Sequence, residues 1–246
     1  MTDVPTSHPR YTSLRLRDAI VSGVESGITS PHGLIAHGRG EAVEYLRGAQ
    51  THAFASQAIR AAAARLRTAK HPVLSINGNT AALVPDDIVQ LSQAIPAPIE
   101  VNIFHASGDR ERAIAAHLKQ AGAEVVLLPD PEVVLDHIDS NRRFVHPKGL
   151  AVADVVFVPL EDGDRCEALV RAGKEVITVD LNPLSRTAQQ ATITIVDNVT
   201  RALPVLVAEI IVIAETPEAE LLSVVENCDN AAVLSTAIER IRVGSR

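Results

Sequence analysis

Two segments of this chain share one order: a helical stretch, an Ala-Gly pair, one or two further residues and an apolar run. They are AGAEVVLL at 121–128 and AGKEVITVD at 172–180. Gly122 and Gly173 stand where a helix ends in a residue of left-handed conformation. Apolar runs rich in Val, Ile and Leu are typical of strands that are buried on both faces of a parallel sheet. This order therefore predicts an α/β fold.

Strands and helices alternate from position 72 onward. We expect strands at 72–76, 99–104, 124–128, 154–158, 175–179 and 192–196. We expect helices from Pro85 onward and at 109–121, 164–172 and 185–191. Such alternation predicts a mainly parallel sheet with helices on both faces.

The two ends of the chain are predicted to be helical. We expect helices at 14–27, at 41–46 and from Thr51, as its cap, to position 70. Between them, a stretch rich in proline and glycine at 31–40 predicts a loop. Two or three helices follow Asn198, broken at Pro217 and at 227–230. Without a Ser/Gly-rich linker, we expect one domain with a helical part at 1–70, a sheet core at 72–197 and C-terminal helices at 198–246.

The composition argues against several classes of protein. Among 246 residues, 30 Asp and Glu outnumber 23 Lys and Arg, for a net charge of −7. This balance argues against binding to a nucleic-acid backbone, and 2% aromatic residues offer few platforms for stacking bases. Hydrophobic residues, at 46%, are enough for a sizeable core and argue against a disordered chain.

The cysteine content and the length of the apolar runs predict the cellular location of the protein. Cys166 and Cys228 are the only cysteines, which fits a reducing cytoplasm and no disulfide framework. The N-terminus MTDVPTSHPRY lacks the apolar region of a signal peptide. The longest apolar run, 202–214, is far shorter than the roughly 20 residues that span a bilayer, so we expect no membrane contact.

Polar segments follow four of the predicted strands, at the edge where open α/β sheets bind ligands. They lie at 77–79, 161–165, 180–187 and 197–198. Each segment alone also has a structural interpretation, because Asn-Gly favours turns and Asp162, Asp164 or Ser185 can cap a helix. Four polar strand ends on one edge favour a ligand site.

The segment after the fifth predicted strand is the most specific of the four. Asp180 ends that strand and is suited to accept hydrogen bonds from a ribose or an adenine amino group. Alternatively, it caps the turn into Asn182. Arg186 and Thr187 begin a helix, where backbone N–H groups and a guanidinium suit a phosphate. This combination predicts a nucleotide site.

The glycine-rich stretch GLIAHGRGE at 33–41 allows two interpretations. It does not fit a P-loop, because Arg39 replaces the lysine, Gly40 replaces the Ser or Thr, and no strand precedes it. Either its glycines allow the backbone to approach a ligand closely, or it is a plain connection between helices. The nine histidines lack the spacing of a zinc site, so we assign no metal ligands.

Six segments together resemble one known family. They are HPRYTSLRLRD at 8–18, GLIAHGRGEA at 33–42, SINGNTAAL at 75–83, EVNIFHASGDR at 100–110, ADVVFVPLEDGDRCEAL at 153–169 and GKEVITVDLNPLSRTAQQATITIVDN at 173–198. In this order they resemble the archaeal phosphopantothenate synthetases, the 4-phosphopantoate–β-alanine ligases of coenzyme A biosynthesis. The last forty residues match less clearly.

The resemblance implies a homodimer with a Rossmann-like fold and an ATP-dependent ligase reaction. ATP, (R)-4-phosphopantoate and β-alanine would give AMP, diphosphate and 4′-phosphopantothenate through an acyl adenylate. Mg²⁺ is expected on the phosphates. An alternative from another class is a non-catalytic dimeric module that senses adenine nucleotides at the same strand ends.

The resemblance also implies which residues hold ATP: Arg17, Arg39, Asp180, Leu181, Asn182, Arg186, Thr187, Asn198 and Val199. The three arginines suit this role because they are always charged and bind phosphate with two N–H groups. Arg39 is also predicted to stabilise the transition state. We assign phosphopantoate binding to Ser75, Asn77 and Asn79, and His37 is a candidate base for the amine of β-alanine.

Overall fold

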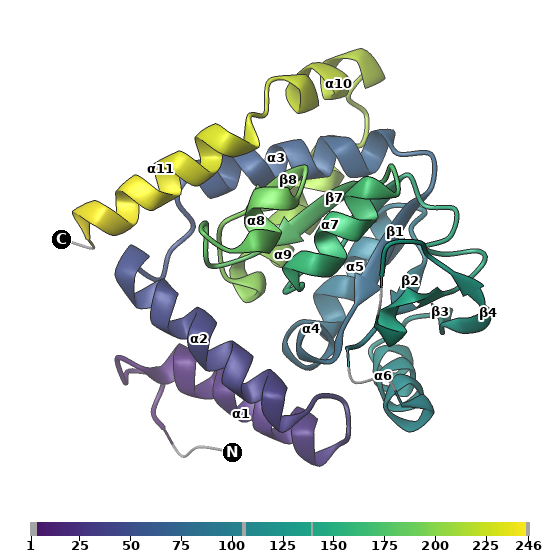
Figure 1. Ribbon diagram of the computed structural model, residues 1–246. Coiled ribbons are helices and arrows are strands. Elements are labelled where there is room, and N and C mark those ends of the chain that lie inside the picture. The colour runs from purple at the N-terminus through teal and green to yellow at the C-terminus, as the bar shows by residue number, and fades with distance from the viewer. Residues whose placement is uncertain (1–3, 105–106, 139, 245–246) are drawn as a thin grey trace.

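Six parallel strands form the centre of the molecule (Figure 1). The structure, a computed structural model, describes residues 4–104, 107–138 and 140–244. The strands are β1 (Pro72–Ile76), β2 (Ile99–Val101), β3 (Val126–Leu127), β6 (Val155–Phe157), β7 (Glu175–Val179) and β8 (Ile193–Ile195). Their order in the sheet is β3-β2-β1-β6-β7-β8. Counted along the chain this is 3-2-1-4-5-6, the Rossmann order, so the predicted α/β fold is confirmed.

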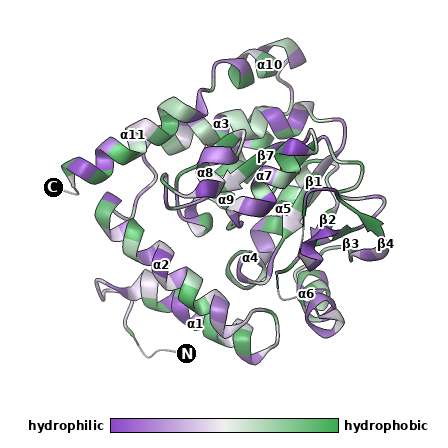
Figure 2. Cartoon of the chain, in the orientation of Figure 1, coloured by the Kyte–Doolittle hydropathy of each residue, from purple (hydrophilic) through white to green (hydrophobic). Residues whose placement is uncertain are grey.

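Both faces of the sheet are covered. Leu74, Phe157 and Ile177 lie in a core formed with α3 (Ala53–Thr68), α5 (Pro85–Ala94), α6 (Gly108–Gln120) and α9 (Val199–Val212). Val156 and Val176, on the opposite face, pack with α7 (Gly163–Arg171) and with part of the segment that joins β3 to β6. With few aromatic residues in the chain, alanines fill much of the first core, and α3 is mostly pale green in Figure 2.

The predicted helix ends at Gly122 and Gly173 are confirmed. Both glycines have positive φ angles, 106° and 79°, which a residue with a Cβ adopts only with strain. The second predicted strand, by contrast, is shorter than expected. It ends at Val101, because the side chain of Asn102 donates to the carbonyl oxygens of Arg142 and Phe144 and the chain leaves the sheet there.

The loop predicted at 31–40 is wrong. A helix, α2, runs from Pro31 to Arg47 and packs beside α1 (Tyr11–Glu25). Pro31 is compatible with the first turn, where its missing N–H would have no partner. Gly33 and Gly40 reflect close packing rather than a turn, because a Cβ at Gly40 would lie 3.1 Å from the Leu181 side chain and one at Gly33 would overlap Asn79.

The predicted cap of α3 is also wrong. His52 is the N-cap residue and makes no capping hydrogen bond through its side chain. The Thr51 hydroxyl instead donates to the Asp197 carboxylate over 2.6 Å, which links the start of α3 to the end of β8.

A small ribbon between β3 and β6 was not predicted. Its antiparallel strands, β4 (Asp130–Val134) and β5 (Phe144–Val145), are joined through a 3-10 turn, η1 (Asn141–Arg143). Most of β4 is exposed or half-buried, so its sequence lacks the apolar pattern of a core strand. The ribbon places Arg142 beside the carboxyl end of the sheet.

The predicted C-terminal helices are confirmed as α9, α10 (Glu218–Glu226) and α11 (Asn230–Val243). The yellow-green α10 and yellow α11 lie along α3 in Figure 1. The Asn230 side chain accepts from the Thr194 N–H at 2.8 Å and donates to the carbonyl oxygens of Ala188 and Ala191. This contact covers the free edge of β8. No described helix is both long and apolar enough to cross a bilayer.

We expect Gly78→Ala to destabilise the protein. Gly78 begins α4 (Gly78–Leu83), and a Cβ there would overlap the Ile28 carbonyl oxygen and lie 3.1 Å from the Thr29 Cα. These are backbone atoms, so the unfolding free energy should fall by about 1–3 kcal/mol in denaturant titrations. Gly38→Ala is the matched control, since nothing lies within 4 Å of its Cβ and alanine favours a helix. Equal stability of the two variants would contradict this packing.

We also expect one buried carboxyl to make stability depend on pH. The Glu100 carboxylate accepts hydrogen bonds from the N–H groups of His146 (3.0 Å) and Leu150 (2.7 Å). Burial nevertheless raises the pKa of Glu100 to about 7 from 4.5. The folded protein thus holds this proton more tightly than the unfolded chain. The stability that Glu100 contributes is fully present below pH 4.5 and is lost as the pH rises through 7.

The measurement is the unfolding free energy of wild type and Glu100→Gln between pH 4.5 and 8. The stability of wild type relative to the variant should fall by about 3 kcal/mol as the pH rises, at about 1.36 kcal/mol per pKa unit. Glu132→Gln, at an exposed position of β4, should leave the profile unchanged. A difference between wild type and Glu100→Gln that stays constant over this range would refute the assignment.

Candidate active site

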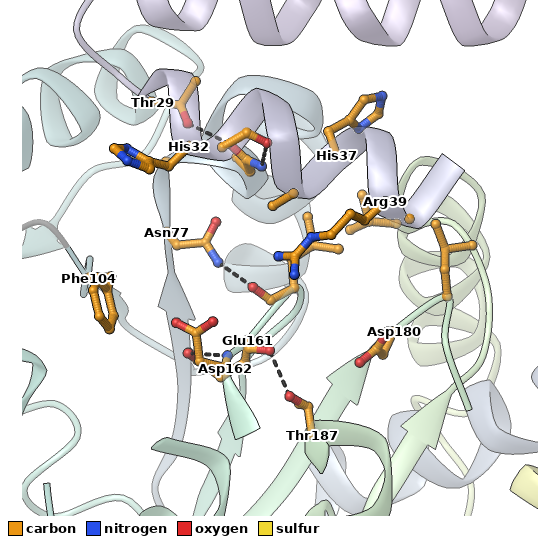
Figure 3. A pocket seen from close by; sticks show the side chains of 18 of the residues that line it. Thr29, His32, His37, Arg39, Asn77, Phe104, Glu161, Asp162, Asp180 and Thr187 are labelled. Atoms are coloured by element: carbon orange, nitrogen blue, oxygen red, sulfur yellow. Dashed lines mark hydrogen bonds between the residues drawn. The ribbon is translucent and has the colours of Figure 1, made fainter. Parts of the chain in front are cut away.

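A pocket of about 590 Å³ opens beyond the carboxyl ends of β1, β6, β7 and β8 (Figure 3). Its walls come from α2, from the chain after β2, and from the starts of α4, α7, α8 (Arg186–Gln190) and α9. The strand order reverses between β1 and β6, which is where doubly wound sheets bind ligands.

Most of the residues predicted for the site line this pocket: His37, Arg39, Asn77, Asn79, Asp180, Leu181, Asn182, Arg186, Thr187, Asn198 and Val199. They come from α2 and from the ends of β1, β7 and β8, so segments far apart in sequence meet here.

Two predicted residues lie elsewhere. Ser75 is buried inside β1, where its hydroxyl accepts a hydrogen bond from Arg165 at 2.9 Å, so the structure does not place it against a substrate. Arg17 lies on α1 and makes two 3.0 Å hydrogen bonds to Glu41, outside the pocket of a single chain. Arg17 as an ATP ligand stays a prediction.

Asn77 and Asn79 shape the pocket through contacts within the protein. The Asn77 amide donates to the carbonyl oxygens of Pro159 (3.2 Å) and Leu160 (3.0 Å), and its oxygen accepts from the Thr80 N–H. Asn79 accepts from the Thr29 hydroxyl and donates to the Gly33 carbonyl at 2.9 Å. Asn77 thus uses both of its amide N–H groups within the protein, whereas Asn79 keeps one amide N–H for a substrate.

Asp180, at the end of β7, caps the turn into Asn182, which was the alternative interpretation of this residue. Its carboxylate accepts hydrogen bonds from the Asn182 N–H at 2.9 Å and from the Ser185 hydroxyl. Burial raises the pKa of Asp180, and these two hydrogen bonds oppose the shift. Ser185 caps α8, as predicted, by accepting from the Ala188 N–H.

Arg39 is the cation best placed to meet an anion. Its guanidinium points into the pocket from α2 in Figure 3, and it has no hydrogen-bond or ion-pair partner among the residues that the structure describes. Arg186, by contrast, pairs with Glu167.

The His37 side chain, unlike that of Arg39, is not directed toward the centre of the pocket (Figure 3). Its ring points away from the other labelled side chains in Figure 3. Burial lowers the pKa of His37, although the charges of Glu41 and Glu44 oppose this. A neutral ring is suited to accept a proton, but this orientation does not favour His37 as the base for an amine in the pocket, and the role stays a prediction.

Sequence reasoning missed a buried cluster of charges at the end of β6. Arg142 donates through Nε to Asn102 at 3.0 Å, and its two terminal nitrogens bond to Glu161 and Asp162. Arg165, which is buried and does not line the pocket, also donates a hydrogen bond to Glu161. The string EDGDR had marked this strand end, but nothing in the sequence pointed to Arg142, since its ribbon has no clear pattern.

The chain offers few ligands for a resident metal ion. No group of three or more His, Cys, Asp or Glu lies together in the described part of the chain. The carboxylates of Glu161 and Asp180 are engaged in hydrogen bonds within the protein. Mg²⁺ often binds through phosphates, waters and only one or two carboxylates. The described residues therefore fit a divalent ion only where the phosphates of a bound nucleotide supply most of its ligands.

The cysteines that the structure describes offer no thiolate nucleophile to the pocket. Cys166 is buried in α7, and burial raises the pKa of its thiol to about 12. It therefore remains protonated and unreactive near neutral pH.

Comparison with known proteins supports a nucleotide-dependent ligase. Residues 54–244 match the phosphopantothenate/pantothenate synthetase family. A 4-phosphopantoate–β-alanine ligase of Methanosarcina mazei is 50% identical over 242 residues, which cover 98% of this chain and 95% of that protein. A ligase of the same name from Thermococcus kodakarensis is 48% identical over 243 residues, covering 98% and 93% of the two chains. With the family match over most of its length and relatives of this similarity, the chain belongs to the phosphopantothenate synthetase family.

Proposed function

We propose that this protein is a 4-phosphopantoate–β-alanine ligase of coenzyme A biosynthesis. The similarity to ligases of that name over 98% of the chain carries the proposal. The Rossmann-type pocket supports it, because it can hold a nucleotide and a second ligand side by side. In the proposed reaction ATP activates (R)-4-phosphopantoate as an acyl adenylate, and β-alanine then displaces AMP.

The nucleotide is proposed to bind at the ends of β7 and β8. Asp180, Leu181 and Asn182 would contact the nucleoside, with Asn198 and Val199 beside them. The triphosphate would lie at the starts of α7 and α8, where backbone N–H groups attract anions. Asp162, the N-cap residue of α7, makes no capping hydrogen bond through its side chain, so the first N–H groups of α7 are not capped by it.

The chemical step brings two anions together. The carboxylate of phosphopantoate attacks the α-phosphorus of ATP, and negative charge develops on the phosphate as diphosphate leaves. Arg39 is proposed to stabilise this charge, because its guanidinium reaches the pocket and has no competing acidic partner among the described residues. A Mg²⁺ ion on the phosphates would help to neutralise the leaving diphosphate.

The protein is also proposed to act as a cytoplasmic homodimer. The outer face of α2 exposes Ile35, Tyr45 and Leu46, which are 65%, 55% and 55% accessible. These side chains lie within one stripe at helical spacing and suit contact with a second copy of the chain. The oligomeric state in solution tests this part of the proposal.

Product analysis distinguishes the ligase from a nucleotide-sensing module. AMP and diphosphate should appear only when ATP, phosphopantoate and β-alanine are all supplied, and chromatography of the nucleotide identifies the product. ADP with free phosphate would overturn the adenylate mechanism. Nucleotide binding without turnover would favour the sensor.

We expect Arg39→Lys to lower kcat by about 10²-fold or more, as is typical when one preorganised donor is removed from a developing charge. Lysine keeps the charge but loses the planar pair of donors. Steady-state kinetics with varied ATP measures the effect. Arg60→Lys, at an exposed position of α3 outside the pocket, is the control and should behave as wild type. A higher KM for ATP with unchanged kcat would show instead that Arg39 binds ground state and transition state equally.

A further inference from the structure

We propose that Asp162 binds the ammonium group of β-alanine and accepts a proton from it before the amine attacks the acyl adenylate. This inference rests on the ligase function proposed above and assigns the second half of that reaction. An amine bears a positive charge near neutral pH and cannot attack until it loses a proton. The pocket therefore needs an anionic group that also serves as a base.

The position of Asp162 fits an incoming cation. It follows β6, the strand next to the reversal of strand order, between Asn77 at the end of β1 and Asp180 at the end of β7. Its side chain is 55% exposed and lines the pocket. Although Asp162 occupies the N-cap position of α7, its carboxylate makes no capping bond and faces the pocket instead (Figure 3).

Arg142 orients this carboxylate. One of its terminal nitrogens donates to Oδ2 of Asp162 at 3.0 Å. The remaining N–H groups of Arg142 are directed at Asn102 and Glu161, so all its donors are used within the protein. Arg142 is thus a positioning residue rather than a ligand for a substrate anion. The other oxygen of Asp162, Oδ1, has no hydrogen-bond partner among the described residues.

The other carboxylates of the pocket are occupied. Glu161 accepts from Arg142, from Arg165 and from the Asp162 N–H. Asp180 accepts from Asn182 and Ser185. Among the described carboxylates that line the pocket, Asp162 is therefore the one with an oxygen to spare.

The environment of Asp162 also suits temporary protonation. Partial burial and the charge of Glu161 raise the pKa of Asp162, while Arg142 lowers it. The carboxylate is thus a somewhat stronger base than an exposed aspartate. Because it remains half-exposed, it can release the proton to water after each turnover.

The proposed transfer step moves two protons from the nitrogen and exchanges one bond at the acyl carbon for another. Oδ1 of Asp162 takes one proton from the ammonium, and the nitrogen lone pair forms a C–N bond with the acyl carbon. The bond between that carbon and the phosphate oxygen then breaks, and AMP leaves with the electron pair. The second proton passes from the nitrogen to the departing phosphate, which leaves the neutral amide.

The test separates the two halves of the reaction in Asp162→Asn. Exchange of labelled diphosphate into ATP, which depends on phosphopantoate but needs no β-alanine, should stay within a few-fold of wild type. Transfer to β-alanine should fall by about 10²-fold or more, the usual contribution of a general base. Hydroxylamine is largely uncharged at neutral pH and should still trap the acyl group as a hydroxamate at the wild-type rate.

Two further variants sharpen the result. Asp164→Asn changes an exposed acid two residues away, outside the pocket lining, and should leave all three rates unchanged. His32→Gln tests a histidine that, like His37, lines the pocket from α2. A selective loss of β-alanine transfer in His32→Gln but not in Asp162→Asn would overturn the assignment. Melting temperatures confirm that each variant is folded.

Failure of this inference differs from failure of the proposed function. If Asp162→Asn loses diphosphate exchange as well, Asp162 serves the ATP half of the reaction and the inference is wrong. Unchanged β-alanine transfer in this variant also refutes it. If wild type itself shows no phosphopantoate-dependent exchange, the adenylate mechanism fails, and the inference fails with it.

Discussion

The ligand pocket depends on the side chain of Asn77. The crevice opens where the strand order reverses, so its two walls belong to β1 and β6. Asn77 follows β1, yet its amide donates to two carbonyl oxygens that follow β6, at Pro159 and Leu160. Leu160 has a φ of 56°, a left-handed conformation that costs a leucine about 1–2 kcal/mol. The hydrogen bonds from Asn77 hold this turn in place, and Glu161 and Asp162 follow it directly.

Buried charges orient the side chains at both ends of the pocket. At the end of β6, Glu161 is bonded to Arg142 and Arg165. Buried ion pairs add little net stability, but removing one partner costs about 3–5 kcal/mol because the other charge is left unpaired. The cluster therefore mainly fixes geometry. A second cluster joins α2 to the end of β8, where Arg201 pairs with both Glu44 and Asp197.

Helix α2 forms one wall of the pocket, and two of its glycines allow it to pack closely against the segments that follow β1 and β7. Gly40 allows the helix to approach Leu181, and Gly33 allows it to approach Asn79. Near its C-terminal end, Glu44 accepts a hydrogen bond from the Asn198 side chain at 3.1 Å. These contacts place Arg39 above the strand ends. The helix that carries Arg39 is thus held by the same segments that are proposed to bind the nucleotide.

The sequence by itself determined the α/β alternation, the helix ends at Gly122 and Gly173, and the family. Strands that are buried on both faces appear in the sequence as runs of Val, Ile and Leu. Helix ends with a left-handed residue appear as a glycine, here Gly122 and Gly173. Because parallel strands bring their carboxyl ends to one edge, the polar residues after β1, β7 and β8 could be expected to meet, and they line one pocket.

Only the tertiary structure decided the conformation of 31–40, the burial of Ser75 and the role of Arg142. Glycines suggest a turn when local preference alone is considered, but in α2 Gly33 and Gly40 pack closely against residues 46 and 141 positions away, Asn79 and Leu181. Arg142 reaches the pocket on a ribbon without apolar periodicity and meets partners 19 and 40 residues distant in sequence. Contacts of such separation leave no local pattern in the sequence, because they depend on where the folded sheet brings the chain together.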